Sequence, residues 1–207
     1  MATKSHITRR NLVLLFLGTS GDPSDTSGSI NGITRFQKLL FLLEREGQLV
    51  PEGDGFQFEA WKAGPYSAGL YDDLELLDNL GFIQSEVSGK ITDAEASEVD
   101  LLDFEDLMGD EEEVSDGITP SPDAYITPSP DAYEERRFTL TEKGREKVVD
   151  LLSREGIDDL VNRIRRIKSK YSHYSLSDLL YHVYTKYPDM TTESEIKEKV
   201  LGRRRVM

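Results

Sequence analysis

One stretch, residues 56–83, limits the folds open to this chain more than any other. Its start alternates between apolar and polar side chains, with apolar residues at Phe56, Phe58 and Ala60. This period-2 pattern is typical of a short, half-buried strand. The pair Gly64-Pro65 then interrupts the strand, and Ser67 occupies the position of a helix N-cap. The stretch therefore predicts a strand that turns sharply into a helix.

The predicted helix covers residues 67–80. Its apolar side chains recur at helical spacing, at Leu70, Leu74 and Leu77. Gly81 stands where a left-handed residue ends a helix, and Phe82-Ile83 begin a new extended run. After a long interruption, Arg136–Leu140 has the pattern of the returning strand, and Thr141 caps a further helix.

This order of strand, helix, strand, hairpin tip, strand and helix is that of a winged helix. We therefore expect a mainly α fold with a small β-hairpin and a winged-helix-like core formed by residues 1–92 and 136–155. Further helices are predicted at residues 8–17 and 33–46, where apolar residues follow a helical period. The Gly- and Ser-rich segment 18–32 between them reads as a loop. Residues 156–207 form a helical extension that we expect to pack on the core.

The interruption, residues 93–135, carries most of the charge of the chain. It contains sixteen acidic residues and no Lys or Arg, whereas the whole chain has a net charge of −14. The octapeptide ITPSPDAY occurs at 118–125 and again, unchanged, at 126–133. Acidic, repetitive, proline-containing sequence buries too little apolar area to offset the entropy of folding. We therefore predict a disordered acidic insert at the tip of the hairpin.

Composition excludes several classes of protein. The chain has no cysteine, so disulfides, thiolate metal sites and cysteine nucleophiles are absent. No apolar run approaches the roughly 18 residues of a membrane span. The apolar run 12–17 is short for a signal peptide and lacks a cleavage site, so we expect a cytoplasmic protein. No spacing of histidines or carboxylates predicts a metal, a cofactor or catalysis, and we expect no enzyme.

Two motifs together resemble a known family. ITRFQKLLFLLE, at 33–44, followed by FEAWKAGPYSAGLYDDLELLDNLGFI, at 58–83, is similar to the SocA/Panacea family of antitoxin-associated domains, and in particular to its YwgA-like branch. The late segment YSLSDLLYHVYTKYP adds to the similarity. The resemblance implies a compact, largely helical domain with winged-helix character. It also implies a link to phage-related loci and to the neutralisation of a partner protein, such as a toxin. The acidic insert departs from the family pattern.

The turn before the helix is the candidate partner-binding site. Gly and Pro fix a sharp turn, and aromatic residues beside a rigid turn are effective interface anchors. The candidate residues are Gly64, Pro65, Tyr66, Ser67 and Tyr71. Trp61 lies nearby in the sequence, and the alternative is that Trp61 and Tyr66 pack into the core. A protein-interaction module that sequesters or presents a partner is thus the first hypothesis.

Binding of nucleic acid is the second hypothesis. A winged helix ordinarily inserts the helix predicted here at 67–80 into a groove, but this helix has no Lys or Arg and carries Asp72, Asp73, Glu75 and Asp78. Acidic side chains oppose the approach to phosphates. A predicted helix at 158–171 is the better candidate, because its outward residues are basic: Arg163, Arg165, Arg166, Lys168 and Lys170. The alternative is that these residues form an ordinary solvated face.

Overall fold

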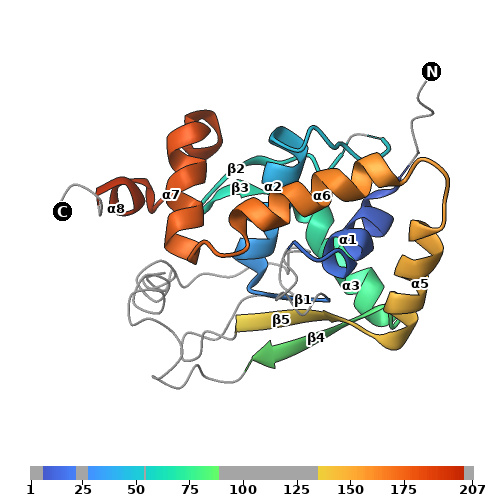
Figure 1. Cartoon of the computed structure of the whole chain (residues 1–207). Coiled ribbons are helices and arrows are strands. Elements are labelled where there is room, and N and C mark those ends of the chain that lie inside the picture. The colour runs from blue at the N-terminus through green and yellow to red at the C-terminus, as the bar shows by residue number, and fades with distance from the viewer. Residues whose placement is uncertain (1–6, 22–27, 54, 89–134, 203–207) are drawn as a thin grey trace.

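The computed structural model describes residues 7–21, 28–53, 55–88 and 135–202, and this part of the chain is mainly helical with two small antiparallel sheets (Figure 1). The helices are α1 (Arg9–Gly18), α2 (Ile33–Arg45), α3 (Ala68–Asn79), α5 (Glu142–Leu152), α6 (Asp158–Tyr171), α7 (Leu176–Lys186), η1 (Pro188–Thr191) and α8 (Lys197–Gly202). The strands are β1 (Ser29–Asn31), β2 (Glu59–Trp61), β3 (Gly64–Tyr66), β4 (Ile83–Ser88) and β5 (Glu135–Leu140). Within the described ranges, no helix has both the length and the apolar content needed to cross a membrane.

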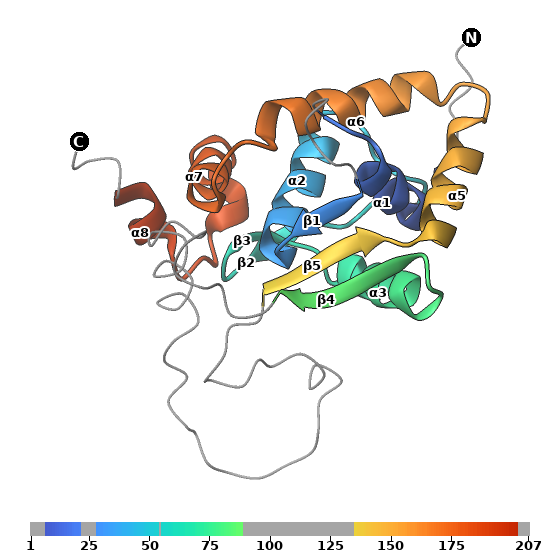
Figure 2. The same cartoon turned by 60° about the horizontal axis from the view of Figure 1, so that its bottom comes forward.

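The larger sheet has the strand order β1-β5-β4, and both of its strand pairs are antiparallel (Figure 2). Strands β4 and β5 form the predicted hairpin arms. Strand β1 lies within residues 18–32, where we expected only a loop, and that expectation is wrong. The strand is only three residues long and buries one side chain, Ile30, so it has no period that the sequence could reveal.

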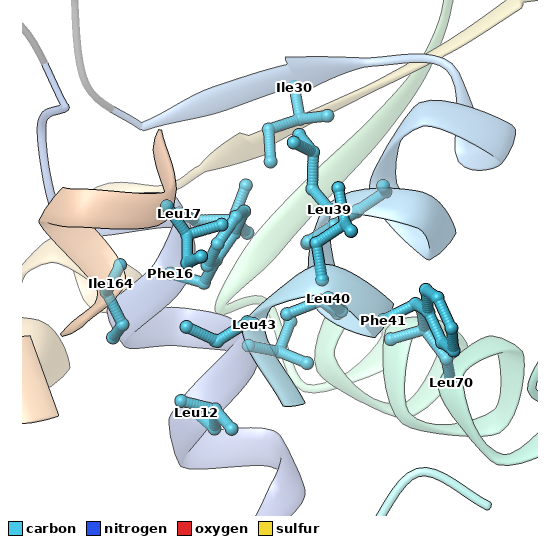
Figure 3. Close-up of a cluster of buried hydrophobic side chains, with 14 of the residues drawn as sticks. Leu12, Phe16, Leu17, Ile30, Leu39, Leu40, Phe41, Leu43, Leu70 and Ile164 are labelled. Atoms are coloured by element: carbon cyan, nitrogen blue, oxygen red, sulfur yellow. The ribbon is translucent and has the colours of Figure 1, made fainter. Parts of the chain in front are cut away.

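The core lies between α1 and α2. Figure 3 shows that Leu12, Phe16 and Leu17 of α1 face Leu39, Leu40 and Leu43 of α2. Ile30, Leu70 and Ile164 close the cluster from β1, α3 and α6. Every residue from 12 to 17 is buried, so α1 is enclosed on all sides rather than amphipathic.

Helices α6 and α7 both contact α2, and α6 runs along the side of α2 that faces away from the larger sheet (Figure 2). The bounds of α6 agree with the predicted helix. Its predicted inward residues are buried, with exposed fractions of 7 %, 0 % and 1 % at Leu160, Ile164 and Ile167. The apolar period of this segment therefore predicts its packing correctly.

The predicted helix ends are confirmed at three positions. The side-chain oxygen of Ser67 accepts a hydrogen bond from the backbone N–H of Leu70 (3.2 Å), and Thr141 does the same for Gly144 (3.1 Å). Gly81 has a φ of 71°, the left-handed conformation that glycine adopts without strain. These caps fix where α3 and α5 begin and where α3 ends.

The predicted acidic insert, 93–135, lies outside the described residues except for Glu135. Ser88 is paired with Glu135 across the β4–β5 ladder, so the chain leaves and re-enters the sheet at directly opposed positions. Replacing residues 89–134 by a short Asn- and Gly-containing turn is therefore expected to keep the ladder intact. Thermal unfolding followed by circular dichroism should show a melting temperature within a few degrees of the full chain, because loop-closure entropy varies slowly with length. A drop of about ten degrees or more would contradict this prediction.

Candidate protein-interaction surface

The β2–β3 hairpin leads directly into α3 and contains residues 64–67, which the sequence predicted to form a turn. The interruption expected at Gly64-Pro65 is wrong, because these residues pair with Trp61 and Ala60 as part of strand β3. Gly64 has a φ of 84°, and a Cβ atom on it would lie 2.9 Å from the ring of Tyr184. Only glycine meets both conditions without strain. Proline is accommodated because β3 is an edge strand.

Helix α2 holds this turn through two consecutive polar residues. The Gln37 amide donates to the backbone carbonyl of Ser67 (3.3 Å) and accepts from its backbone N–H (2.9 Å). Lys38 Nζ donates to the carbonyl of Pro65 at 3.0 Å. The Ser67 hydroxyl also donates to the carbonyl of Phe56. Gln37, Lys38 and Ser67 are all buried, so the turn is fixed to the core by hydrogen bonds in a low-dielectric setting.

Three aromatic side chains contact one another in succession, and we call them the aromatic row: Trp61, Tyr66 and Tyr71. The ring centroids of Trp61 and Tyr66 are 5.8 Å apart, and those of Tyr66 and Tyr71 are 5.6 Å apart. Trp61 is 48 % exposed, and both tyrosines are half-buried. Burial raises the pKa of Tyr71 to about 12, so its hydroxyl is neutral at physiological pH. The row thus presents a polar-edged aromatic surface on a rigid support.

The five residues predicted to bind a partner divide into two groups. Gly64, Pro65 and Ser67 are buried and shape the turn. Tyr66 and Tyr71 reach the surface and are the members that a partner can touch. Trp61, which the sequence analysis left between surface and core, joins them as the most exposed ring.

One edge of α3 beside the row is acidic, as expected, but Asp73 is not part of the exposed surface. Asp72 and Glu75 are exposed and Asp78 is half-buried, whereas Asp73 is 2 % exposed. Asp73 accepts from Arg9 Nε (2.8 Å) and Arg10 Nε (3.0 Å) of α1. The sequence places Asp73 at the edge of the apolar stripe, and the structure buries it there. Two arginines from a distant segment compensate the charge and allow it to be buried.

The basic helix α6 differs from the expectation at Lys168. Instead of pointing outward, Lys168 is 4 % exposed and its Nζ donates to the carbonyls of Phe16 (3.1 Å) and Thr19 (2.6 Å). These carbonyls belong to the C-terminal end of α1 and the residue that caps it. The lysine therefore joins α6 to the negative end of the α1 dipole.

Three of the remaining basic residues of α6 bind the C-terminal end of α2. Arg163 donates to the carbonyls of Gly47 (3.2 Å) and Gln48 (3.1 Å), and Arg166 to that of Glu46 (3.3 Å). Lys170 Nζ contacts the Glu46 carboxylate at 2.9 Å. The fifth, Arg165, donates to the Asn162 side chain at 2.8 Å. The structure thus gives Arg163, Arg166 and Lys170 intramolecular partners at a helix terminus.

Glu46 is the centre of a polar network that the sequence analysis did not identify. Its carboxylate is 11 % exposed and accepts from the Tyr171 hydroxyl (2.7 Å) and from Lys186 Nζ (2.8 Å), and His182 Nε2 lies 3.0 Å away. Burial acts to raise the pKa of Glu46. The hydrogen bonds from these partners and from Lys170 outweigh burial and hold that pKa well below its usual range. The network joins the end of α2 to both α6 and α7.

In the described part of the chain, no three His, Asp or Glu side chains gather as ligands of a metal ion. Comparison with models of protein families finds none that matches this chain, and comparison with curated proteins finds no match either.

Proposed function

We propose that this chain is a non-enzymatic protein-interaction module with a winged-helix-like core, which binds a partner protein through the aromatic row. The main observation that supports this proposal is the exposure of Trp61. An aromatic ring that is 48 % exposed, packed in a tilted contact against a second ring and carried on a hairpin held by buried hydrogen bonds, is already in place before a partner arrives. Binding to such a surface loses little side-chain entropy, which is why Trp and Tyr dominate interface energetics.

The order of elements supports the winged-helix part of the proposal. Helix α1, strand β1, helices α2 and α3 and strands β4 and β5 follow one another in the chain, with the β2–β3 hairpin inserted before α3. The strands associate in the order β1-β5-β4. In a winged helix, α3 takes the position of the recognition helix and the β4–β5 connection takes that of the wing.

An antitoxin-like role, in which the module sequesters or presents a partner such as a toxin, is supported by how the resembling motifs meet. Gln37 and Lys38 belong to the segment ITRFQKLLFLLE and bond directly to the Gly-Pro-Tyr-Ser turn. The two segments that carry the resemblance to SocA/Panacea domains therefore act as one structural unit. Its outer surface is the aromatic row.

The nucleic-acid hypothesis has less support. The exposed side chains of α3 include Asp72 and Glu75, and the helix has no basic residue. On α6, Lys168 is buried and three other cations contact the end of α2. Cations already held by carbonyls and a carboxylate have less to gain from phosphates. We therefore favour a protein partner.

Photo-crosslinking tests the proposal. A benzophenone amino acid placed at position 61 should crosslink a discrete partner in the native host, whereas the same probe at Val149 should not. Val149 is a suitable control because it is 67 % exposed on α5, away from the hairpin. The partner identified by mass spectrometry is then purified and titrated by calorimetry.

In that titration, Trp61→Ala and Tyr66→Ala should each weaken binding by about 1–3 kcal/mol, while Val149→Ala stays within about 0.5 kcal/mol of the unmodified chain. Circular dichroism melts of the same variants show whether the fold is kept. If Val149→Ala weakens binding as much as Trp61→Ala does, or if the folded Trp61 variant binds normally, the aromatic row is not the interface.

A further inference from the structure

The aromatic row adjoins carboxylates at both ends. Glu59 is the direct cross-strand partner of Tyr66, and it lies two residues from Trp61 on the same face of β2. On α3, Tyr71, Glu75 and Asp78 follow the spacing i, i+4 and i+7, so the two acids continue the edge on which the ring lies. Each half of the row is thus next to a negative charge.

These carboxylates are not explained by the stability of the fold. Among the described residues, none forms an ion pair with Glu59, Glu75 or Asp78. Asp78 lies in the last turn of α3, which contains no basic residue. A negative charge at the C-terminal end of a helix opposes the helix dipole and is mildly destabilising.

The nearby cations contact other carboxylates or lie at one end of the row. Lys62 follows Trp61 in the turn between β2 and β3, and its Nζ lies 3.7 Å from the Glu195 carboxylate. Arg136 is near enough to act electrostatically on Tyr71, at one end of the row. Arg9 and Arg10 are bound to the buried Asp73 on another side of α3. The faces of the rings add their own negative quadrupole to the carboxylates.

We infer that the occupant of this surface is a cationic, arginine-bearing segment of a partner protein, bound in an extended conformation across Trp61, Tyr66 and Tyr71. The inference rests on the proposed function and specifies the chemistry of its partner. A guanidinium group stacks on an aromatic ring and hydrogen-bonds to a carboxylate at the same time, which neither an acidic nor a purely apolar segment does. An apolar segment would also remove Glu59 and Glu75 from water without compensation.

The dimensions of the row fit such a segment. The centroid spacings of 5.8 Å and 5.6 Å are close to the roughly 6–7 Å between alternate residues of an extended chain. Arginines at every second position therefore match successive rings and their neighbouring carboxylates. The rigid hairpin sets the register, because Lys38 and Gln37 hold the turn from beneath.

A peptide titration tests this inference without knowledge of the partner. The probe is a capped synthetic peptide, Gly-Arg-Ala-Arg-Ala-Arg-Gly, and the reporter is the fluorescence of Trp61, the single tryptophan of the chain. We expect saturable binding with a dissociation constant at or below about 1 mM, weakened by added salt. The same peptide with glutamine at each arginine position should leave the fluorescence unchanged.

The variant Glu75→Gln with Asp78→Asn should weaken binding of the peptide by about threefold to tenfold, as expected for two exposed charge contacts. The matched control, Glu146→Gln with Glu155→Gln, removes the same charge from exposed positions on α5 and beside it, and should change binding less than about twofold. Equal weakening by both variants would mean that only the overall charge matters and would overturn the inference.

Two further outcomes would also overturn the inference. The first is that the full chain shows no saturable binding of the peptide. The second is that binding appears only after residues 203–207 are removed, because the basic segment Arg203–Arg205 would then be the occupant. Crosslinking at position 61 separates the two proposals. If the peptide fails but a partner is still captured at 61 and lost with Trp61→Ala, the interaction surface stands and its partner is not cationic. If both fail, the proposed function fails as well.

Discussion

Between about pH 7 and 9.5, below the range in which tyrosines titrate, the free energy of unfolding is expected to rise by about 3 kcal/mol, owing to one buried lysine. Burial lowers the pKa of Lys38 from 10.5 to about 7, and its side chain makes a single hydrogen bond, to the Pro65 carbonyl, within the described structure. Between these two pH values the unfolded chain holds a proton that the folded chain has released. Stability therefore increases with pH across this window and is lowest below it.

The variant Lys38→Met isolates this effect. Methionine keeps the straight shape of the side chain without the charge, but it leaves the Pro65 carbonyl unpaired at a cost of about 1–3 kcal/mol. We expect the variant to be more stable than the unmodified chain near pH 6 and less stable above pH 10, so that the two curves cross.

Urea unfolding followed by circular dichroism at several pH values gives both curves. Lys143→Met, which removes an exposed lysine on α5 that donates to the Leu80 carbonyl (2.7 Å) and lies over the Phe82 ring, is the control for loss of a lysine and its carbonyl hydrogen bond without a buried charge. If the curves of the chain and of Lys38→Met run parallel, Lys38 is charged in the folded state or reaches water. Agreement would show that the turn beneath the aromatic row is held by a neutral lysine.

The sequence predicted the elements whose signals are local. The cap at Ser67, the left-handed Gly81 and the full length of α6 follow from residues within a few positions of each other. The hairpin β2–β3 was predicted only in part, since a Gly-Pro pair normally breaks a strand. It forms a strand here because Tyr184, from a distant helix, packs against the bare backbone of Gly64.

The sequence pointed to the aromatic residues of the candidate site but left open whether Trp61 and Tyr66 are exposed, and it did not reveal the burial of Asp73 and Lys168. A helical period places every Lys or Asp on the outer face unless an opposite group reaches it from elsewhere. For Asp73 that group comes from α1, and for Lys168 it is the end of α1, more than 140 residues away in the chain. No pattern within α3 or α6 contains this information, so the sequence predicts an outward Lys168 and an Asp73 at the edge of the apolar stripe.

Glu46 is another residue whose partners come from distant parts of the chain and cannot be read from a local pattern. Nothing in the sequence around it distinguishes it from other acids at helix ends, yet five side chains from α6, α7 and the residue after α7 converge on it. Removing its charge leaves Lys186 and Lys170 beside a carbonyl-rich helix end and weakens the hydrogen bond from Tyr171. We expect Glu46→Gln to lower the free energy of unfolding by about 2–4 kcal/mol.

The pH dependence of this loss has a defined sign. The folded-state pKa of Glu46 lies below its unfolded value of 4.5, so the contribution is complete above pH 4.5 and fades as the pH falls below it. The difference in the free energy of unfolding between the unmodified chain and Glu46→Gln should therefore become smaller as the pH falls below 4.5. Asp150→Asn, which removes an exposed carboxylate of α5 that pairs with Lys147 and Arg154, is the control and should leave stability almost unchanged.

A double-mutant cycle shows whether the network acts as a unit. Combining Glu46→Gln with Tyr171→Phe should give a coupling free energy of about 1–2 kcal/mol in urea unfolding, because the two groups share a hydrogen bond of 2.7 Å. Strictly additive effects would mean that water replaces the carboxylate at no cost. In that case α6 and α7 are held on α2 mainly by their apolar faces, through residues such as Ile164, Ile167 and Val183.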